Sequence, residues 1–206
     1  MSFIEKLLIS SQKISVPCQT DEEYKITSNQ CSWCAALFGL KYKELKDAFI
    51  SDKSKFLEIY TECLKEGTNL RKEFGKPVYG ENIDNETLKE KLNLEDKIMI
   101  EFTYELNKDS RDELVSILPE DLKKEFYTEK YIDISDFLAL SLYKFILISR
   151  HGQSFTLVPF GEYFLVLDSH VHNVGLMTKD NAYKYIKYSL DYELTGYLFT
   201  TILCCT

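Results

Sequence analysis

The chain has 206 residues, enough for one domain with a substantial buried core. Its composition, 45% hydrophobic and 28% charged, is that of an ordinary globular protein. The net charge of −8 argues against non-specific nucleic-acid binding, because the chain has no excess of cations to displace the counterions of a phosphate backbone. The sequence has no run of about 18 apolar residues, so no membrane-spanning helix is predicted.

The N-terminal segment 1–14 carries Glu5 and Lys6 inside its apolar stretch. This pattern predicts an amphipathic helix rather than a signal peptide. The six cysteines are too sparse for a disulfide scaffold, and two of them end an apolar strand-like segment. We therefore expect buried thiols in a reducing compartment: the cytoplasm, or the host cytosol if the source is a virus or an intracellular bacterium.

The first part of the chain has mainly helical periodicity, and the last part has strand patterns. Helices are predicted over 31–50, 53–73, 84–94 (with Asp84 as N-cap) and 109–127, and a strand over 98–104. Strands are then predicted over 141–150, 153–160, 162–170, 172–177 and 193–205, with a helix over 182–190. Pro159-Phe160-Gly161 is typical of a tight hairpin. The order predicts one segregated α+β domain, with a helical lobe over about 1–139 and an antiparallel sheet over about 140–206.

A polar turn leads into a helix at Ser28-Asn29-Gln30-Cys31. Ser28 or Asn29 could cap this helix, which would place a partly exposed Cys31 in its first turn. Free N–H groups and the positive end of the helix dipole favour a thiolate there and can hold an oxyanion. Cys34 lies one turn deeper and should point toward the core. The alternative is that both cysteines are small apolar residues of a buried helix.

Two further polar elements could complete a catalytic site. Alternation along a strand would place Asp168 and His170 on one face, where the carboxylate could fix the imidazole tautomer. Gln19, twelve residues before Cys31, could donate its amide to an oxyanion. The bland alternatives are a surface turn and a solvated loop. His151 is a rival base that would also use Asp168, and His172 is a third candidate.

Metal and redox sites use some of the same residues. Cys31, Cys34, His170 and His172 could supply four zinc ligands, but a second Cys-x-x-Cys is absent from the sequence. A thioredoxin-like dithiol would normally follow a strand, and no early strand is convincing. We therefore expect neither a metal nor a cofactor.

The residues Gln19, Gln30-Cys31-Ser32 and Asp168-Ser169-His170 together resemble the herpesvirus tegument-type deubiquitinases and their relatives outside viruses. The resemblance implies a papain-like fold with a central helix that bears the nucleophile. It assigns Cys31 as nucleophile, His170 as base, Asp168 as the orienting acid and Gln19 as oxyanion donor. Cys34 departs from the family pattern, which often has Asn there, and Val171 stands where Gly is frequent. In a papain-type register Cys34 would be the nucleophile, but here Trp33 precedes it.

The resemblance implies a cysteine isopeptidase that removes ubiquitin or a ubiquitin-like modifier through a thioester. The partner would be ubiquitin or a ubiquitin-like protein, with no nucleic acid or membrane, and we expect a monomer. An acidic rim would suit the basic tail of ubiquitin, and 50–130 is the candidate recognition surface by position. A general papain-like cysteine protease or acyltransferase would have the same triad. From a different class, the chain could be a non-catalytic interaction module or a zinc-stabilised domain.

Overall fold

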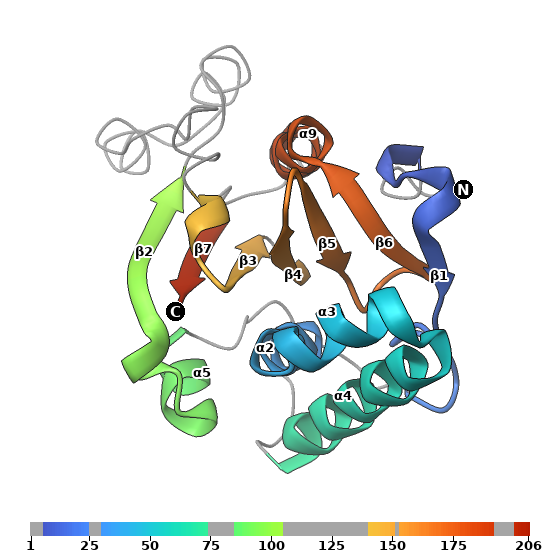
Figure 1. Ribbon diagram of the computed structural model, residues 1–206. Coiled ribbons are helices and arrows are strands. Elements are labelled where there is room, and N and C mark those ends of the chain that lie inside the picture. The colour runs from blue at the N-terminus through green and yellow to red at the C-terminus, as the bar shows by residue number, and fades with distance from the viewer. Residues whose placement is uncertain (1–5, 25–29, 74–84, 105–139, 151–152, 192–199) are drawn as a thin grey trace.

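The computed structural model describes residues 6–24, 30–73, 85–104, 140–150, 153–191 and 200–206. Its described strands form one antiparallel sheet of seven strands in the order β1-β6-β5-β4-β3-β7-β2 (Figure 1). The strands are β1 Lys13–Ser15, β2 Ile98–Tyr104, β3 Phe145–Arg150, β4 Gln153–Phe160, β5 Tyr163–Leu167, β6 Asn173–Thr178 and β7 Thr200–Cys205.

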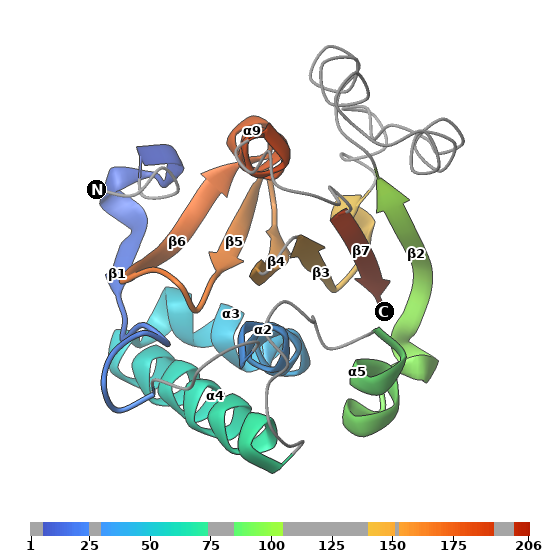
Figure 2. The same cartoon turned by 180° about the vertical axis from the view of Figure 1, so that it is seen from behind.

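Helices cover both sides of this sheet. They are α2 Gln30–Leu40, α3 Tyr42–Ser51, α4 Lys53–Glu73, α5 Asn85–Leu92 and α9 Lys179–Asp191, with short 3₁₀ turns at Ser10–Gln12, Glu95–Lys97 and Leu140–Leu142. Both views place the strands between α9 on one side and α2, α3 and α4 on the other (Figures 1 and 2). Among the described residues, no helix has the length and apolar character needed to cross a bilayer.

Side chains alternate between the two faces of the sheet along β4, so this strand contacts the helices on both sides. Thr156 donates its hydroxyl to the carbonyl of Ala35 in α2, and the Ser154 and Ser32 hydroxyls lie 3.0 Å apart. Phe155, which points to the opposite face, packs against Tyr185 of α9 with 5.0 Å between ring centroids. Since successive strand residues face opposite sides, β4 fixes the position of both helices.

The helix α2 is buried on all sides, as expected of a helix that is apolar around its circumference. It approaches α4 closely at Gly67, where a Cβ atom would lie 2.6 Å from Cys34 Sγ. Any side chain at position 67 would therefore push the two helices apart. This close packing brings Tyr60 of α4 under the sheet, where its hydroxyl donates to the carbonyl of Asp168 at 2.9 Å.

The α+β class, with helices packed on an antiparallel sheet, is confirmed. The single helix predicted over 31–50 is wrong: the chain breaks at Lys41, because α2 is buried all round whereas α3 buries only Leu45 and Ala48 and exposes its polar face. The N-terminal helix predicted over 1–14 is wrong in its extent: among the described residues only 6–7 are helical. Residues 10–12 form a 3₁₀ turn, and 13–15 form β1, whose Ile14 is buried opposite Val174.

The remaining differences are at the ends of elements. The sheet was predicted over about 140–206, but it also includes β1 and β2, which lie in the segment 1–139 predicted as the helical lobe. Helix α9 begins three residues before the predicted 182, because the Thr178 hydroxyl caps it by accepting the N–H of Asn181 at 3.1 Å. The predicted helix 109–127, the cap Asp84 and the start of the strand 193–205 lie outside the described residues.

Candidate active site

Cys31 is the second residue of α2, so its side chain and backbone N–H lie in the first turn, as predicted. Backbone N–H groups in that turn have no partner within the helix and concentrate positive partial charge. The proposed caps Ser28 and Asn29 lie outside the described residues. The prediction of a partly exposed thiol is wrong: Cys31 is only 2% exposed, because the start of α2 is enclosed together with the rest of the helix.

His170 and Asp168 lie side by side, but not on a strand. Strand β5 ends at Leu167, and Asp168 to His170 form a turn, which corrects the strand predicted through 170. Oδ1 of Asp168 accepts the backbone N–H of His170 at 2.9 Å and lies 2.8 Å from His170 Nδ1. An Asp side chain that binds the N–H two residues later favours a turn over a continued strand, so the same carboxylate ends β5 and holds the imidazole.

Asp168 is buried, with 1% of the residue exposed, and it accepts hydrogen bonds from two helices. Tyr185 of α9 donates its hydroxyl to Oδ2 at 2.8 Å, while Tyr60 of α4 donates to the backbone carbonyl of the same residue. A buried carboxylate is costly unless donors satisfy its oxygens. With both oxygens bound, Asp168 can remain ionised beside His170.

The His170 side chain also hydrogen-bonds Cys31, which completes a chain Asp168–His170–Cys31. Burial lowers the pKa of His170, but the charge and hydrogen bond of Asp168, together with Cys31, outweigh it and raise the pKa to about 10. The site therefore favours an imidazolium next to the sulfur. That arrangement matches a nucleophile paired with a base that a third group orients.

Gln19 is joined to this turn through Ser169. Its backbone N–H donates to the carbonyl of Ser169 at 2.7 Å, and the Ser169 hydroxyl donates to Gln19 Oε1 at 2.7 Å. The side chain of Gln30 donates to the carbonyls of Gln19 at 3.1 Å and Tyr24 at 3.0 Å. The structure thus ties the segment that carries Gln19 to the residue before Cys31 and to the residue before His170.

The rival candidates lie elsewhere or outside the described residues. His172 pairs with Asp21 near the surface, with 2.9 Å between Nε2 and Oδ1. Cys34 is fully buried against α4, and burial raises the pKa of its thiol well above the usual value. His151 lies outside the described residues. Within the described ranges, no three His, Cys, Asp or Glu side chains are arranged to hold a metal ion.

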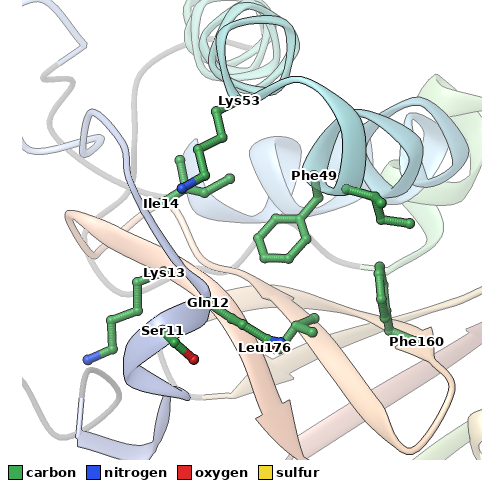
Figure 3. A pocket seen from close by; sticks show the side chains of 9 residues that line it. Ser11, Gln12, Lys13, Ile14, Phe49, Lys53, Phe160 and Leu176 are labelled. Carbon is green, nitrogen blue, oxygen red and sulfur yellow. The ribbon is translucent and has the colours of Figure 1, made fainter.

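A cavity of about 300 Å³ lies between β1, the end of α3, the start of α4 and the β4–β5 hairpin (Figure 3). Phe49, Phe160, Leu176 and Lys53 are among its lining residues, and the predicted site residues are not. On the sheet the cavity is lined by Phe160 at the end of β4 and Leu176 of β6, whereas Asp168 and His170 follow the end of β5. It is therefore separate from the hydrogen-bonded site.

Sequence reasoning named Gln19, Cys31, Asp168 and His170, and the structure brings them into one connected network. It missed Ser169, Gln30, Tyr60 and Tyr185. The first two stood inside the quoted motifs, where their polarity was an available signal. The two tyrosines occupy buried helical positions and carry no local mark of a polar role.

No family model matches the sequence. No curated protein sequence matches it either. Among solved structures, it is similar to the ubiquitin-specific protease encoded by murine cytomegalovirus tegument protein M48, in complex with a ubiquitin-based suicide substrate. The TM-score is 0.52 at 11% sequence identity, and the match covers 94% of this chain and 84% of that one. The protein therefore shares the fold of a herpesvirus tegument ubiquitin-specific protease over nearly its whole length.

Proposed function

We propose that this protein is a cysteine isopeptidase that removes ubiquitin or a ubiquitin-like modifier. The observation that carries the proposal is the hydrogen-bonded chain Asp168–His170–Cys31 at the first turn of α2. The fold shared with a protease solved on a ubiquitin-based substrate supports the substrate class. Cys31 acts as nucleophile, His170 as general base and acid, Asp168 as the orienting carboxylate and Gln19 as oxyanion donor.

The reaction begins with His170 as the imidazolium that the site favours, beside the Cys31 sulfur as thiolate. The sulfur attacks the carbonyl carbon of the modifier's C-terminal glycine, and the carbonyl oxygen becomes an oxyanion. The N–H groups at the start of α2 and the side-chain amide of Gln19 stabilise that charge. The C–N bond then breaks, and the lysine amine leaves with the proton from His170.

The product of this step is a thioester between Cys31 and the modifier. His170, now neutral, removes a proton from a water molecule that attacks the thioester. Collapse of the second tetrahedral intermediate expels the Cys31 sulfur and releases the modifier, whose new carboxyl group loses its proton to solvent, while His170 keeps the proton taken from water and the resting state is restored. Asp168 is a hydrogen-bond acceptor throughout and stabilises each imidazolium that forms.

The burial of Cys31 constrains the substrate. Because Cys31 is only 2% exposed, its thiol is accessible only to a thin chain that displaces neighbouring groups of the protein. The Gly-Gly end of a ubiquitin-like tail has no side chains and fits that requirement. We also propose the reducing cytosol as the site of action, because a thiol nucleophile must stay reduced to work.

The proposal is tested with ubiquitin that carries a C-terminal alkyne electrophile. We expect the intact mass of the protein to rise by one modifier, and Cys31→Ala to remain unlabelled. Cys34→Ala is the matched control, because it removes the other thiol of the same helix and should label normally.

Each other outcome assigns the protein differently. Loss of labelling in Cys34→Ala alone would support the papain-type register. Labelling of Cys31 by iodoacetamide but by no ubiquitin-family probe would support a general cysteine protease or acyltransferase. If neither reagent modifies Cys31, the interaction-module alternative holds.

A further inference from the structure

We propose that Ser169 is the positioning residue of the oxyanion donor Gln19. This inference rests on the proposed function, in which Gln19 donates its amide to the transition state. It concerns the middle residue of Asp168-Ser169-His170, to which the triad itself gives no role.

The contact between Ser169 and Gln19 has two points. The backbone N–H of Gln19 donates to the Ser169 carbonyl at 2.7 Å, and the Ser169 hydroxyl donates to Gln19 Oε1 at the same distance. The first bond fixes the backbone of Gln19 and the second fixes the far end of its side chain. Ser169 is 1% exposed, so water has little access to compete for this hydroxyl.

The second bond determines where the amide donors point. A Gln amide is planar, with its oxygen and its NH₂ group on opposite sides of Cδ. Holding Oε1 against Ser169 therefore turns the two N–H donors of Nε2 away from Ser169. An oxyanion donor must be oriented before charge develops, because reorientation during the reaction would cancel part of its benefit.

The turn after β5 consequently orients two catalytic groups at once. Its first and third residues bind each other, with 2.8 Å between Asp168 Oδ1 and His170 Nδ1. Its second residue sends its hydroxyl to Gln19 instead. The Gln30 side chain, next to Cys31, binds the Gln19 carbonyl at 3.1 Å, so the donor is also tied to the residue before the nucleophile.

The kinetic test compares Ser169→Ala, Gln19→Ala and the double variant on a ubiquitin C-terminal amide substrate. Removing an oxyanion donor costs about 10²–10³ in kcat, and a donor left misaligned loses about a tenfold share of that. We expect Ser169→Ala to lower kcat by about tenfold without changing KM. In the Gln19→Ala background the same substitution should have no further effect, because nothing remains to be positioned. Ser149→Ala removes a serine hydroxyl that binds Ser154 at 3.0 Å and is the control expected to keep wild-type kcat.

A second measurement needs no turnover. In ¹⁵N spectra the side-chain amide of Gln19, assigned by its loss in Gln19→Glu, should be as ordered as the backbone in the wild type and mobile in Ser169→Ala. If the wild type hydrolyses no ubiquitin-family substrate, the proposed function fails and this amide measurement alone decides the positioning. An amide that stays ordered in Ser169→Ala would overturn the inference, as would an equal loss of kcat with and without Gln19.

Discussion

Two histidine–carboxylate pairs lie close together in this protein. Their N–O distances are nearly equal, but their exposure and their hydrogen-bond partners differ. His170 and Asp168 are joined over 2.8 Å, and His172 and Asp21 over 2.9 Å. The first pair has side chains that are 20% and 2% exposed, and the second has side chains that are 61% and 40% exposed. Distance alone therefore does not distinguish a candidate catalytic pair from a surface ion pair.

The surroundings of the two carboxylates make the difference. Tyr185 from a separate helix binds the second oxygen of Asp168, and the imidazole partner continues to Cys31. Asp21 instead uses its second oxygen to accept the N–H of Cys18 at 2.8 Å, a contact within its own turn. The buried pair is built from the sheet end and two helices, and its charge interactions are little screened by water. The exposed pair closes a surface loop and is expected to contribute little to stability.

The largest expected effect comes from removing each imidazole in turn. His170→Ala should lower kcat by about a hundredfold or more, since a general base is lost, whereas His172→Ala should keep activity within about twofold. Steady-state hydrolysis of a ubiquitin C-terminal amide measures both. An inactive His172→Ala beside an active His170→Ala would reverse the assignment, and if both are active the base must be sought at His151.

The next largest difference between the two pairs is expected when each carboxylate is neutralised. Asp168→Asn keeps the shape but removes the charge that opposes the desolvation of His170, so the pKa of His170 should fall from about 10. We expect kcat to fall by about a hundredfold or more, because the imidazolium loses its partner. Asp21→Asn should change neither quantity. Titration of the His170 ring resonances, together with kcat, tests this, and an unchanged titration in Asp168→Asn would contradict it.

Site residues that belong to short polar motifs could be predicted from the sequence. Partners that contact them from distant parts of the chain could not. Gln19, Cys31, Asp168 and His170 could be named because each belongs to a short polar motif at the edge of an apolar segment. The partners of Asp168 could not, because Tyr60 is 108 residues away and its hydroxyl arrives only through the packing of α4 on α2.

Some element boundaries were predicted wrongly because they too depend on contacts that the local sequence pattern does not show. The break at Lys41 depends on how deeply α2 is buried, which periodicity does not report, and β1 is too short to stand out without its partner β6. The end of β5 at Leu167 is set by the Asp168 carboxylate binding the N–H of His170, a side-chain contact that competes with strand alternation.

The two tyrosines bound to Asp168 give a matched pair of smaller perturbations. Tyr185→Phe removes a donor to the carboxylate, and a hydrogen bond to a charged group contributes about 1.5–3 kcal/mol, so kcat should fall about tenfold. Tyr60→Phe removes a donor to the backbone carbonyl and should lower the free energy of unfolding by about 1 kcal/mol while kcat stays near wild type. Urea denaturation and kinetics on both variants measure the two effects. Equal kcat values for Tyr185→Phe and Tyr60→Phe would show that the hydrogen bond from the Tyr185 hydroxyl to Asp168 Oδ2 does not contribute to catalysis.

The two pairs should also differ in how the stability of the protein depends on pH. His170 has a folded-state pKa of about 10, above its ordinary 6.5, so its protonated form favours the folded state. This contribution is complete below pH 6.5 and is lost as pH rises through 10. The pKa of Asp21 is lowered from 3.8 by the Cys18 N–H and by His172, so its contribution is present above pH 3.8 and is lost as pH falls further.

Urea denaturation of the wild type, His170→Gln and Asp21→Asn across pH 3 to 10 measures the loss of stability on the alkaline side and on the acid side. The difference in unfolding free energy between wild type and His170→Gln should shrink on the alkaline side. The difference for Asp21→Asn, already small because that pair is solvated, should shrink on the acid side only. A His170→Gln difference that stays constant from pH 6 to 10 would mean that the buried pair binds its proton no more tightly than the unfolded chain does. The contrast between the two pairs would then lie in their access to Cys31 and not in their electrostatics.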